Sequence, residues 1–362
     1  MKKFNDGSRA VAVWIGLGVI MLIIQVILGG VTRLTGSGLS ITEWNVVTGT
    51  LPPLSERQWL AEFDKYRQTP QFQLLNMDFK VEDFKFIFFW EWLHRFWARL
   101  IGMVFIVGYI YLVARRYLKK EMVRPLLILF LLGALQGAVG WIMVASGLTG
   151  DAVYVKPTRL ALHFIFAMGL IAYAFWFLLD LRIPAAERLR RPKTARFAVT
   201  LVVLTSIQLA FGALMAGHKA STAAPTWPDI NGNFFPTAMF QHSPAILNLV
   251  DNKITIHFIH RSLAYLLIVL IACLSWNLSR NRDLPTSIRR CRLLPFILVV
   301  VQAGLGIASL LFSRSIVPGH WRSFEWFAQL HQVTGMLLVL SLITIVYQFT
   351  GEKNLRPKAE LI

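Results

Sequence analysis

Long runs of apolar residues, separated by shorter polar segments, recur along the whole chain. A helix that crosses a hydrocarbon core of about 30 Å needs roughly 20 apolar residues, and eight of the runs reach that length. Of the 362 residues, 56% are hydrophobic and 15% are charged, a balance typical of a lipid-facing surface. The sequence therefore predicts an all-α, polytopic membrane protein. The expected transmembrane helices cover residues 11–31, 86–114, 125–145, 158–181, 197–216, 254–276, 293–313 and 325–348.

The positive charge is concentrated in alternate connecting segments. The net charge is +18, and 22 of the 37 Lys and Arg residues lie in the two terminal segments and in every second loop. Basic loops stay preferentially in the cytoplasm, so we expect both termini to be cytoplasmic. The basic residues flank the membrane instead of lining one helix or groove, which argues against nucleic-acid binding. The two cysteines, Cys273 and Cys291, form no Cys-x-x-Cys-His motif, so any heme must be held without thioether bonds.

The chain repeats a Gln-x-x-x-Gly element in its odd-numbered spans. The Gln and the Gly of each copy share a helix face, and their simplest role is close helix packing, with the amide bonded to a neighbour. Four spans per half give both halves the same orientation in the membrane. We therefore predict two four-helix bundles, residues 1–182 and 183–362, related by a pseudo-twofold axis along the membrane normal. The four copies begin at Gln25, Gln136, Gln208 and Gln302.

Histidines occupy matched depths in the even-numbered spans. His94 and His260 are 166 residues apart, and His163 and His331 are 168 residues apart. Ionisable residues inside a membrane are costly and normally mark function. Two neutral histidines at one depth on facing helices can ligate a heme iron, so we expect His94 to pair with His163 and His260 with His331. A hydrogen bond to a neighbouring helix is the alternative for any single histidine, and zinc or copper is the competing metal, although no carboxylate or cysteine set completes such a site.

The two halves differ next to the first histidine of each pair. Glu91 lies three residues before His94, whereas His257 holds that position before His260. Residues three apart share a helix face, so Glu91 is expected to face the same cavity as His94 and is a candidate proton donor or acceptor. The alternative is an ion pair with an arginine of its own helix, Arg95 or Arg99. The first half also has a long outside segment, residues 32–85, in which residues 55–66 have the spacing of an amphipathic helix; the corresponding segment 217–253 predicts no clear helix.

Several arginines lie near the outer ends of the spans. Arg95 and Arg261 each follow a predicted ligand histidine, and Arg33 lies at the outer end of the first span. Because heme propionates are anionic, we expect these three residues to be their partners. Arg159 and Lys253 are equally well explained by snorkelling to lipid headgroups.

Four motifs together resemble one known family. The chain is similar to the heme A synthases over essentially its whole length, and its long first outside segment is more like the proteobacterial and mitochondrial branch than the Gram-positive one. The cysteine pair in the outside loops of the Gram-positive branch is absent here. The resemblance therefore does not imply that electrons pass through a pair of thiols in this chain. The motifs are Gly29-Gly-Val-Thr-Arg-Leu-Thr-Gly-Ser-Gly-Leu-Ser40, Pro52-Pro53, Phe84-Lys-Phe86 and Glu91-Trp-Leu-His-Arg95.

The resemblance implies a specific reaction and a division of labour. The family oxidises the C8 methyl group of heme O to the formyl group of heme A, through an alcohol and a gem-diol, for use in cytochrome c oxidase. It implies a resident heme b on His260 and His331, and the substrate heme on His94 and His163 beside a catalytic Glu91. The partners implied are heme O, heme O synthase, cytochrome c oxidase assembly factors, membrane lipid and an electron acceptor that the sequence does not identify. A homo-oligomer is compatible with the sequence.

Two other functions use the same histidine pairs. A di-heme cytochrome b would pass electrons without modifying heme, and a non-catalytic membrane heme carrier would only bind it. A carboxylate beside only one of the two pairs favours the synthase over both, because pure electron transfer does not require an acid at one ligand.

Overall fold

The described part of the chain forms eight long helices, as the hydrophobic pattern predicts. The computed structural model describes residues 6–44, 48–281, 284–317 and 319–351, and no β-strand forms in that part of the chain. Each predicted span coincides with one long helix to within a few residues. The membrane-spanning helices are α1 (Asp6–Leu34), α4 (Val81–Ala114), α5 (Lys120–Ala145), α6 (Pro157–Arg182), α7 (Pro192–Gly217), α8 (Lys253–Arg280), α10 (Leu294–Phe312) and α11 (Ser323–Phe349).

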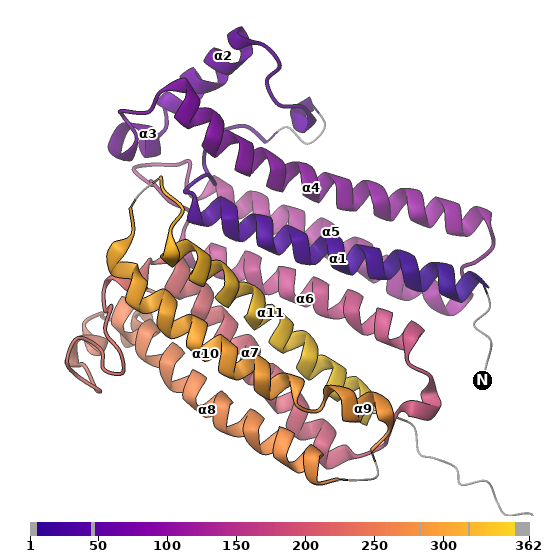
Figure 1. The fold of residues 1–362 in the computed structure, drawn as a ribbon. Coiled ribbons are helices and arrows are strands. Elements are labelled where there is room, and N and C mark those ends of the chain that lie inside the picture. The colour runs from indigo at the N-terminus through magenta and orange to yellow at the C-terminus, as the bar shows by residue number, and fades with distance from the viewer. Residues whose placement is uncertain (1–5, 45–47, 282–283, 318, 352–362) are drawn as a thin grey trace, which may run out of the picture.

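The long helices run side by side, with two different ends (Figure 1). The short helices α2 (Glu56–Arg67) and α3 (Pro70–Leu75) lie at one end together with the segment 218–252. The start of α1, the end of α11 and the short basic helix α9 (Thr286–Cys291) lie at the other. This arrangement agrees with the separation of basic and long outside segments in the sequence. The termini themselves, residues 1–5 and 352–362, fall outside the described residues, and their cytoplasmic location stays a prediction.

The same helix pairs pack in each half of the chain. In the first half α1 packs on α4 and α6, and α5 packs on α6; in the second, α7 packs on α8 and α11, and α10 packs on α11. The halves meet where α6 contacts α7 and α11, and where α1 contacts α11. This pairing is compatible with the two predicted bundles. The pseudo-twofold axis stays a prediction.

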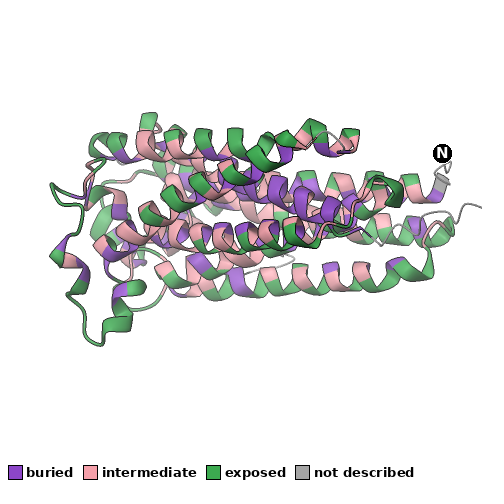
Figure 2. Ribbon diagram, turned by 90° about the horizontal axis from the view of Figure 1, so that it is seen from below, coloured by how far each residue is buried: buried purple, intermediate pink, exposed green. Residues whose placement is uncertain are grey.

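Burial separates a central helix from a lipid-facing one. In the most apolar 18-residue stretch of α11, 61% is buried, against 6% in the corresponding stretch of α4. The exposed apolar residues of α4, such as Met103, Val107 and Ile110, face outward, and exposed residues cover the outer surfaces of the peripheral helices (Figure 2). Such a continuous apolar surface would promote aggregation in water and is expected in contact with lipid chains.

The first outside segment is folded onto the end of α4. Helix α2 begins with a capping box in which Ser55 accepts from the Gln58 N–H and Gln58 caps Ser55 in return. Its apolar side is buried: the Tyr66 and Phe84 rings stack with their centres 5.3 Å apart, and Phe63 packs on the same Phe84. The predicted amphipathic helix over residues 55–66 is therefore confirmed. The segment 218–252 contains only short 3-10 turns, also as predicted.

Candidate functional site

All four matched histidines line one large cavity. The cavity has a volume of about 1590 Å³ and reaches both halves of the molecule. It receives His94 from α4, His163 from α6, His260 from α8 and His331 from α11. Four different helices therefore bring the four histidines to one space, in agreement with the equal depth in the membrane predicted for them.

The second-half pair has the spacing of two imidazoles on a single metal. The ring centres of His260 and His331 are 6.3 Å apart, with 72° between the ring planes. Two imidazoles bound to the same iron atom, each with an iron–nitrogen distance of about 2 Å, have ring centres roughly 6 Å apart. His331 Nδ1 donates to the main-chain oxygen of Gln302 at 3.0 Å, so Nε2 is the unprotonated nitrogen that can bind a metal; Gln302 Nε2 lies 3.3 Å from it. These residues fit a bis-histidine heme.

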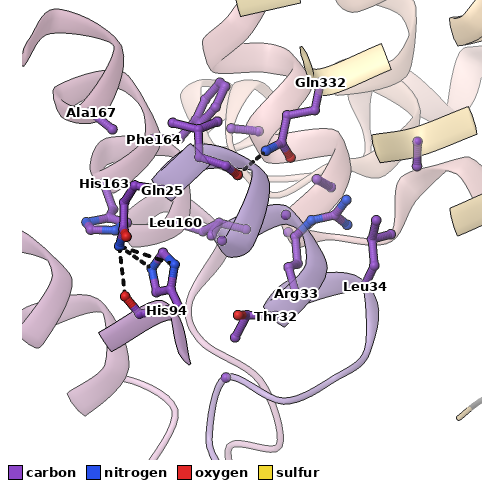
Figure 3. Close-up of a pocket in the computed structure, with 18 of the residues that line it drawn as sticks. Gln25, Thr32, Arg33, Leu34, His94, Leu160, His163, Phe164, Ala167 and Gln332 are labelled. Carbon is purple, nitrogen blue, oxygen red and sulfur yellow. Dashed lines mark hydrogen bonds between the residues drawn. The ribbon is translucent and has the colours of Figure 1, made fainter. Parts of the chain in front are cut away.

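The first-half pair projects into the cavity next to a glutamine of α1 (Figure 3). Gln25 Nε2 donates to the main-chain oxygen of His94 at 3.1 Å and lies 3.3 Å from each of its ring nitrogens. Gln136 of α5 contacts His163 in the same way, at 3.2 Å from its main-chain oxygen. His94 and His163 thus lie together, and each is held by a copy of the repeated Gln-x-x-x-Gly element.

Glu91 is buried and bonded to the outside segment. Its side chain is 3% exposed. Oε2 accepts hydrogen bonds from Ser40 N, from Ser40 Oγ and from Ile41 N, at 2.7, 2.7 and 2.9 Å. Oε1 forms an ion pair with Arg95, one turn along α4. The ion pair that was the structural alternative for Glu91 is therefore present, and Glu91 lines the cavity as well.

Sequence reasoning did not predict the bonds of Glu91 to Ser40 and Ile41. Ser40 is the last residue of the Gly29–Ser40 motif, and that motif is the only signal that could have pointed to it. The contact ties the stretch after α1 to the outer part of α4, over the first histidine pair.

Arg95 and Arg261 hold the outside segments by their main-chain oxygens. Arg95 donates to Ile41 O at 3.0 Å and to Glu43 O at 2.9 Å. Arg261 donates to three main-chain oxygens between residues 224 and 229, at 2.6 to 3.2 Å. The two arginines thus play equivalent parts in the two halves, and most of their donors are engaged. Their predicted role as propionate partners stays a prediction.

Arg33 differs from these two arginines. It lies in the last turn of α1 and lines the cavity, on the same side of the close-up as Gln332 (Figure 3). No hydrogen bond or ion pair engages its guanidinium among the described residues. Of the three predicted propionate partners, it has the most donors free for an anion.

His257, in the position that corresponds to Glu91, is also buried in the cavity wall. It is 1% exposed, and neither ring nitrogen has a hydrogen-bond partner in the described part of the chain. Sequence reasoning noted only its position. The two halves thus present different polar groups beside their first histidine, a carboxylate bonded to a loop in one and an unpaired imidazole in the other.

The first half is open between α4 and α5. These two helices barely touch, whereas the corresponding α8 and α10 pack against each other. Gly102, Gly133 and Gly137 line the cavity there, and a Cβ added to any of them would meet nothing within 4 Å. Stacked rings of Phe105 and Phe130, with centres 6.4 Å apart, close the far end. The cavity therefore reaches the lipid-facing side of the first half.

The alternative of a zinc or copper site gains no support. Within residues 6–44, 48–281, 284–317 and 319–351, no three His, Cys, Asp or Glu side chains gather as a metal site. The imidazole pairs are better suited to a metal whose other ligands come from a macrocycle.

Comparisons with known proteins identify the family of this chain. The family model COX15-CtaA, described as cytochrome oxidase assembly protein, matches residues 12–350. A protein of Rhodospirillum centenum named "Heme A synthase" is 43% identical over 311 residues, 84% of this chain and 81% of its own. Proteins of the same name from a Bradyrhizobium strain and from Methylorubrum populi are 42% and 40% identical, over 91% and 93% of this chain and 88% and 86% of theirs. The chain therefore belongs to the COX15-CtaA family of cytochrome oxidase assembly proteins.

Proposed function

We propose that this protein is a heme A synthase, which oxidises the C8 methyl group of heme O to a formyl group. The observation that carries the proposal is a single cavity with two histidine pairs, of which the first has the buried carboxylate of Glu91 three residues before His94 and an opening to the membrane. Relatives named for this activity, similar over most of the chain, support it. The protein would act in a bacterial inner membrane, with both termini in the cytoplasm.

The second half, residues 183–362, would hold the resident cofactor. His260 and His331 have the ring spacing that a bis-histidine heme b requires. A heme held there supplies one-electron redox chemistry. His331 donates its Nδ1 proton to Gln302 O, so Nε2 would be the ligand nitrogen.

The first half, residues 1–182, would bind heme O through His94 and His163. Glu91, Arg95 and the stretch Ser40–Ile41 close the outer end of this site and exclude water from it. Conversion of the methyl group to a formyl group, with water as the source of oxygen and the electron acceptor taking the electrons, releases protons, and the Glu91 carboxylate is our candidate for taking one up. Arg33 is our first candidate for a propionate partner, and Arg95 and Arg261 would contribute donors that the loops leave free.

The opening between α4 and α5 suits a substrate with a hydrophobic tail. Heme O carries an isoprenoid chain, which is unfavourable in water and soluble in the bilayer. The groove runs from His94 to Phe105, about 16 Å along α4. Heme O would therefore arrive from the lipid phase, supplied by heme O synthase, and the product would pass to cytochrome c oxidase assembly factors. The electron acceptor is a further partner.

Chromatography of extracted heme tests the proposal directly. Membranes that contain this chain and a heme O source should yield heme A, and membranes that contain His94→Ala should yield heme O only. Bound low-spin heme without any heme A would instead indicate a di-heme cytochrome b. Heme O that is bound and released unchanged would indicate a carrier.

A further inference from the structure

Each histidine of the two pairs lies against a Gln-x-x-x-Gly element of a neighbouring helix. We call each such element, with the histidine it holds, a socket. In three sockets the glutamine amide donates to the main-chain oxygen of the histidine itself, at 2.9 to 3.2 Å. In the fourth, Gln302 Nε2 lies 3.3 Å from His331 Nε2. The sockets are Gln25–Gly29 with His94, Gln136–Gly140 with His163, Gln208–Gly212 with His260, and Gln302–Gly306 with His331.

The glycine of each socket leaves room for the imidazole. A Cβ at this position would lie 2.8 to 3.2 Å from Cε1 of the histidine in all four sockets, closer than ordinary van der Waals contact. Other glycines of the same helices, such as Gly18, Gly137 and Gly304, have nothing within 4 Å of a Cβ. The absence of a side chain is therefore needed at the socket position but not at every glycine of these helices; Gly30 of α1 and Gly217 of α7 are also closely packed, against Gln329 and Pro157.

Close approach also lets the ring reach the helix backbone. His331 Nδ1 donates to Gln302 O, the carbonyl that lies one turn before Gly306. A ligand histidine usually donates its second ring N–H to such an acceptor, and this bond fixes both the tautomer and the ring orientation. A methyl group at position 306 would push the ring away from that carbonyl.

The four glutamine side chains make no hydrogen bond other than those to the histidines, within the described residues. Their four Oε1 atoms are buried and have no partner in the described residues. Leaving a buried acceptor unpaired costs about 1–3 kcal/mol, and a residue chosen only for helix packing would avoid that cost. The amide is thus committed to the histidine beside it.

We propose that the four sockets are positioning devices for the heme ligands, in which glycine sets the ring plane and, in three of the four, glutamine holds the histidine main chain. The inference rests on the proposed function only in taking the four histidines as heme ligands. The simplest interpretation of these elements was close helix packing. The inference instead gives them a direct effect on the metal site. Changes in a socket should therefore alter the electronic properties of the bound heme.

The test compares Gly306→Ala with Gly304→Ala, two residues apart on α10, in the purified full-length protein with its heme. Gly306→Ala should shift the low-spin electron paramagnetic resonance signal of the resident heme and weaken heme binding roughly 10- to 100-fold. Gly304→Ala should leave both as in the wild type, because its methyl group meets nothing. A wild-type signal and affinity in Gly306→Ala would overturn the inference.

A third variant separates ligand positioning from folding. Gly140→Ala alters the socket of His163 in the other half, so it should weaken heme binding by the first pair and leave the resident signal unchanged. Loss of the resident signal in both Gly140→Ala and Gly306→Ala would mean that the glycines serve only the fold, and would reject the inference. A wild-type protein without any low-spin bis-histidine signal would refute the proposed function itself, and the inference with it.

Discussion

Glu91→Gln is the substitution that best separates the two roles of this carboxylate. Glutamine keeps the shape of the side chain and one oxygen that can accept from Ser40 N and Ile41 N. It loses the charge that pairs with Arg95. The stretch after α1 should then detach more often from α4, because Glu91 and Arg95 both hold it.

The size of the effect follows from the contacts. Removing one partner of a buried ion pair costs about 3–5 kcal/mol. Arg95 keeps its bonds to Ile41 O and Glu43 O, so it is not left without partners and the cost is smaller. We expect about 2–3 kcal/mol, which is roughly a 30- to 150-fold increase in opening.

Amide hydrogen exchange of a peptide covering residues 36–44 measures this opening. Ser40→Ala is the matched control, because it removes one donor to Glu91 and leaves the carboxylate in place. The low-spin spectrum of the resident heme reports whether the second half is intact. Heme A production is measured in the same membranes.

Three results are informative. If Glu91 acts by closing the site, both variants should lose heme A production in proportion to their increase in exchange. If Glu91 takes up protons, production in Glu91→Gln should fall far below that relation. Unchanged exchange of residues 36–44 in Glu91→Gln would refute the reasoning, because the carboxylate would then not hold the segment.

Three further predictions concern other parts of the molecule. His260→Ala and His331→Ala should each abolish the resident low-spin heme spectrum, and a full signal in both variants would reject the pairing. Gly133→Leu should fill the opening between α4 and α5 and weaken binding of heme O more than that of heme B, which lacks the tail; Gly169→Leu, on the exposed side of α6, is the control and should change neither titration. Burial raises the pKa of the Tyr66 phenol to about 12, above its ordinary value of about 10. The outside segment should therefore lose stability as pH rises between these values. Tyr66→Phe should remove this pH dependence from the amide exchange of α2.

The eight spans, helix α2 and the common depth of the histidines could be predicted from the order of residues along the chain. These features depend on the length of apolar runs and on local helical spacing, which are properties of contiguous residues. Their depth followed because a residue's position along a spanning helix fixes its height in the bilayer. The internal repeat then predicted which histidines pair, and the 6.3 Å between the rings of His260 and His331 agrees with that pairing.

The surroundings of these residues depend on how helices and loops pack in three dimensions. Glu91 was expected to face the cavity, but its bonds to Ser40 and Ile41 depend on how a segment 50 residues earlier folds back over α4. The opening between α4 and α5 depends on how far two whole helices stand apart, and no single residue encodes that distance. The repeated glycines could be counted in the sequence, but their contact with the imidazoles required the rotation of each helix about its axis. Spacing along one helix gives the face on which a residue lies, and packing between helices gives what that face touches.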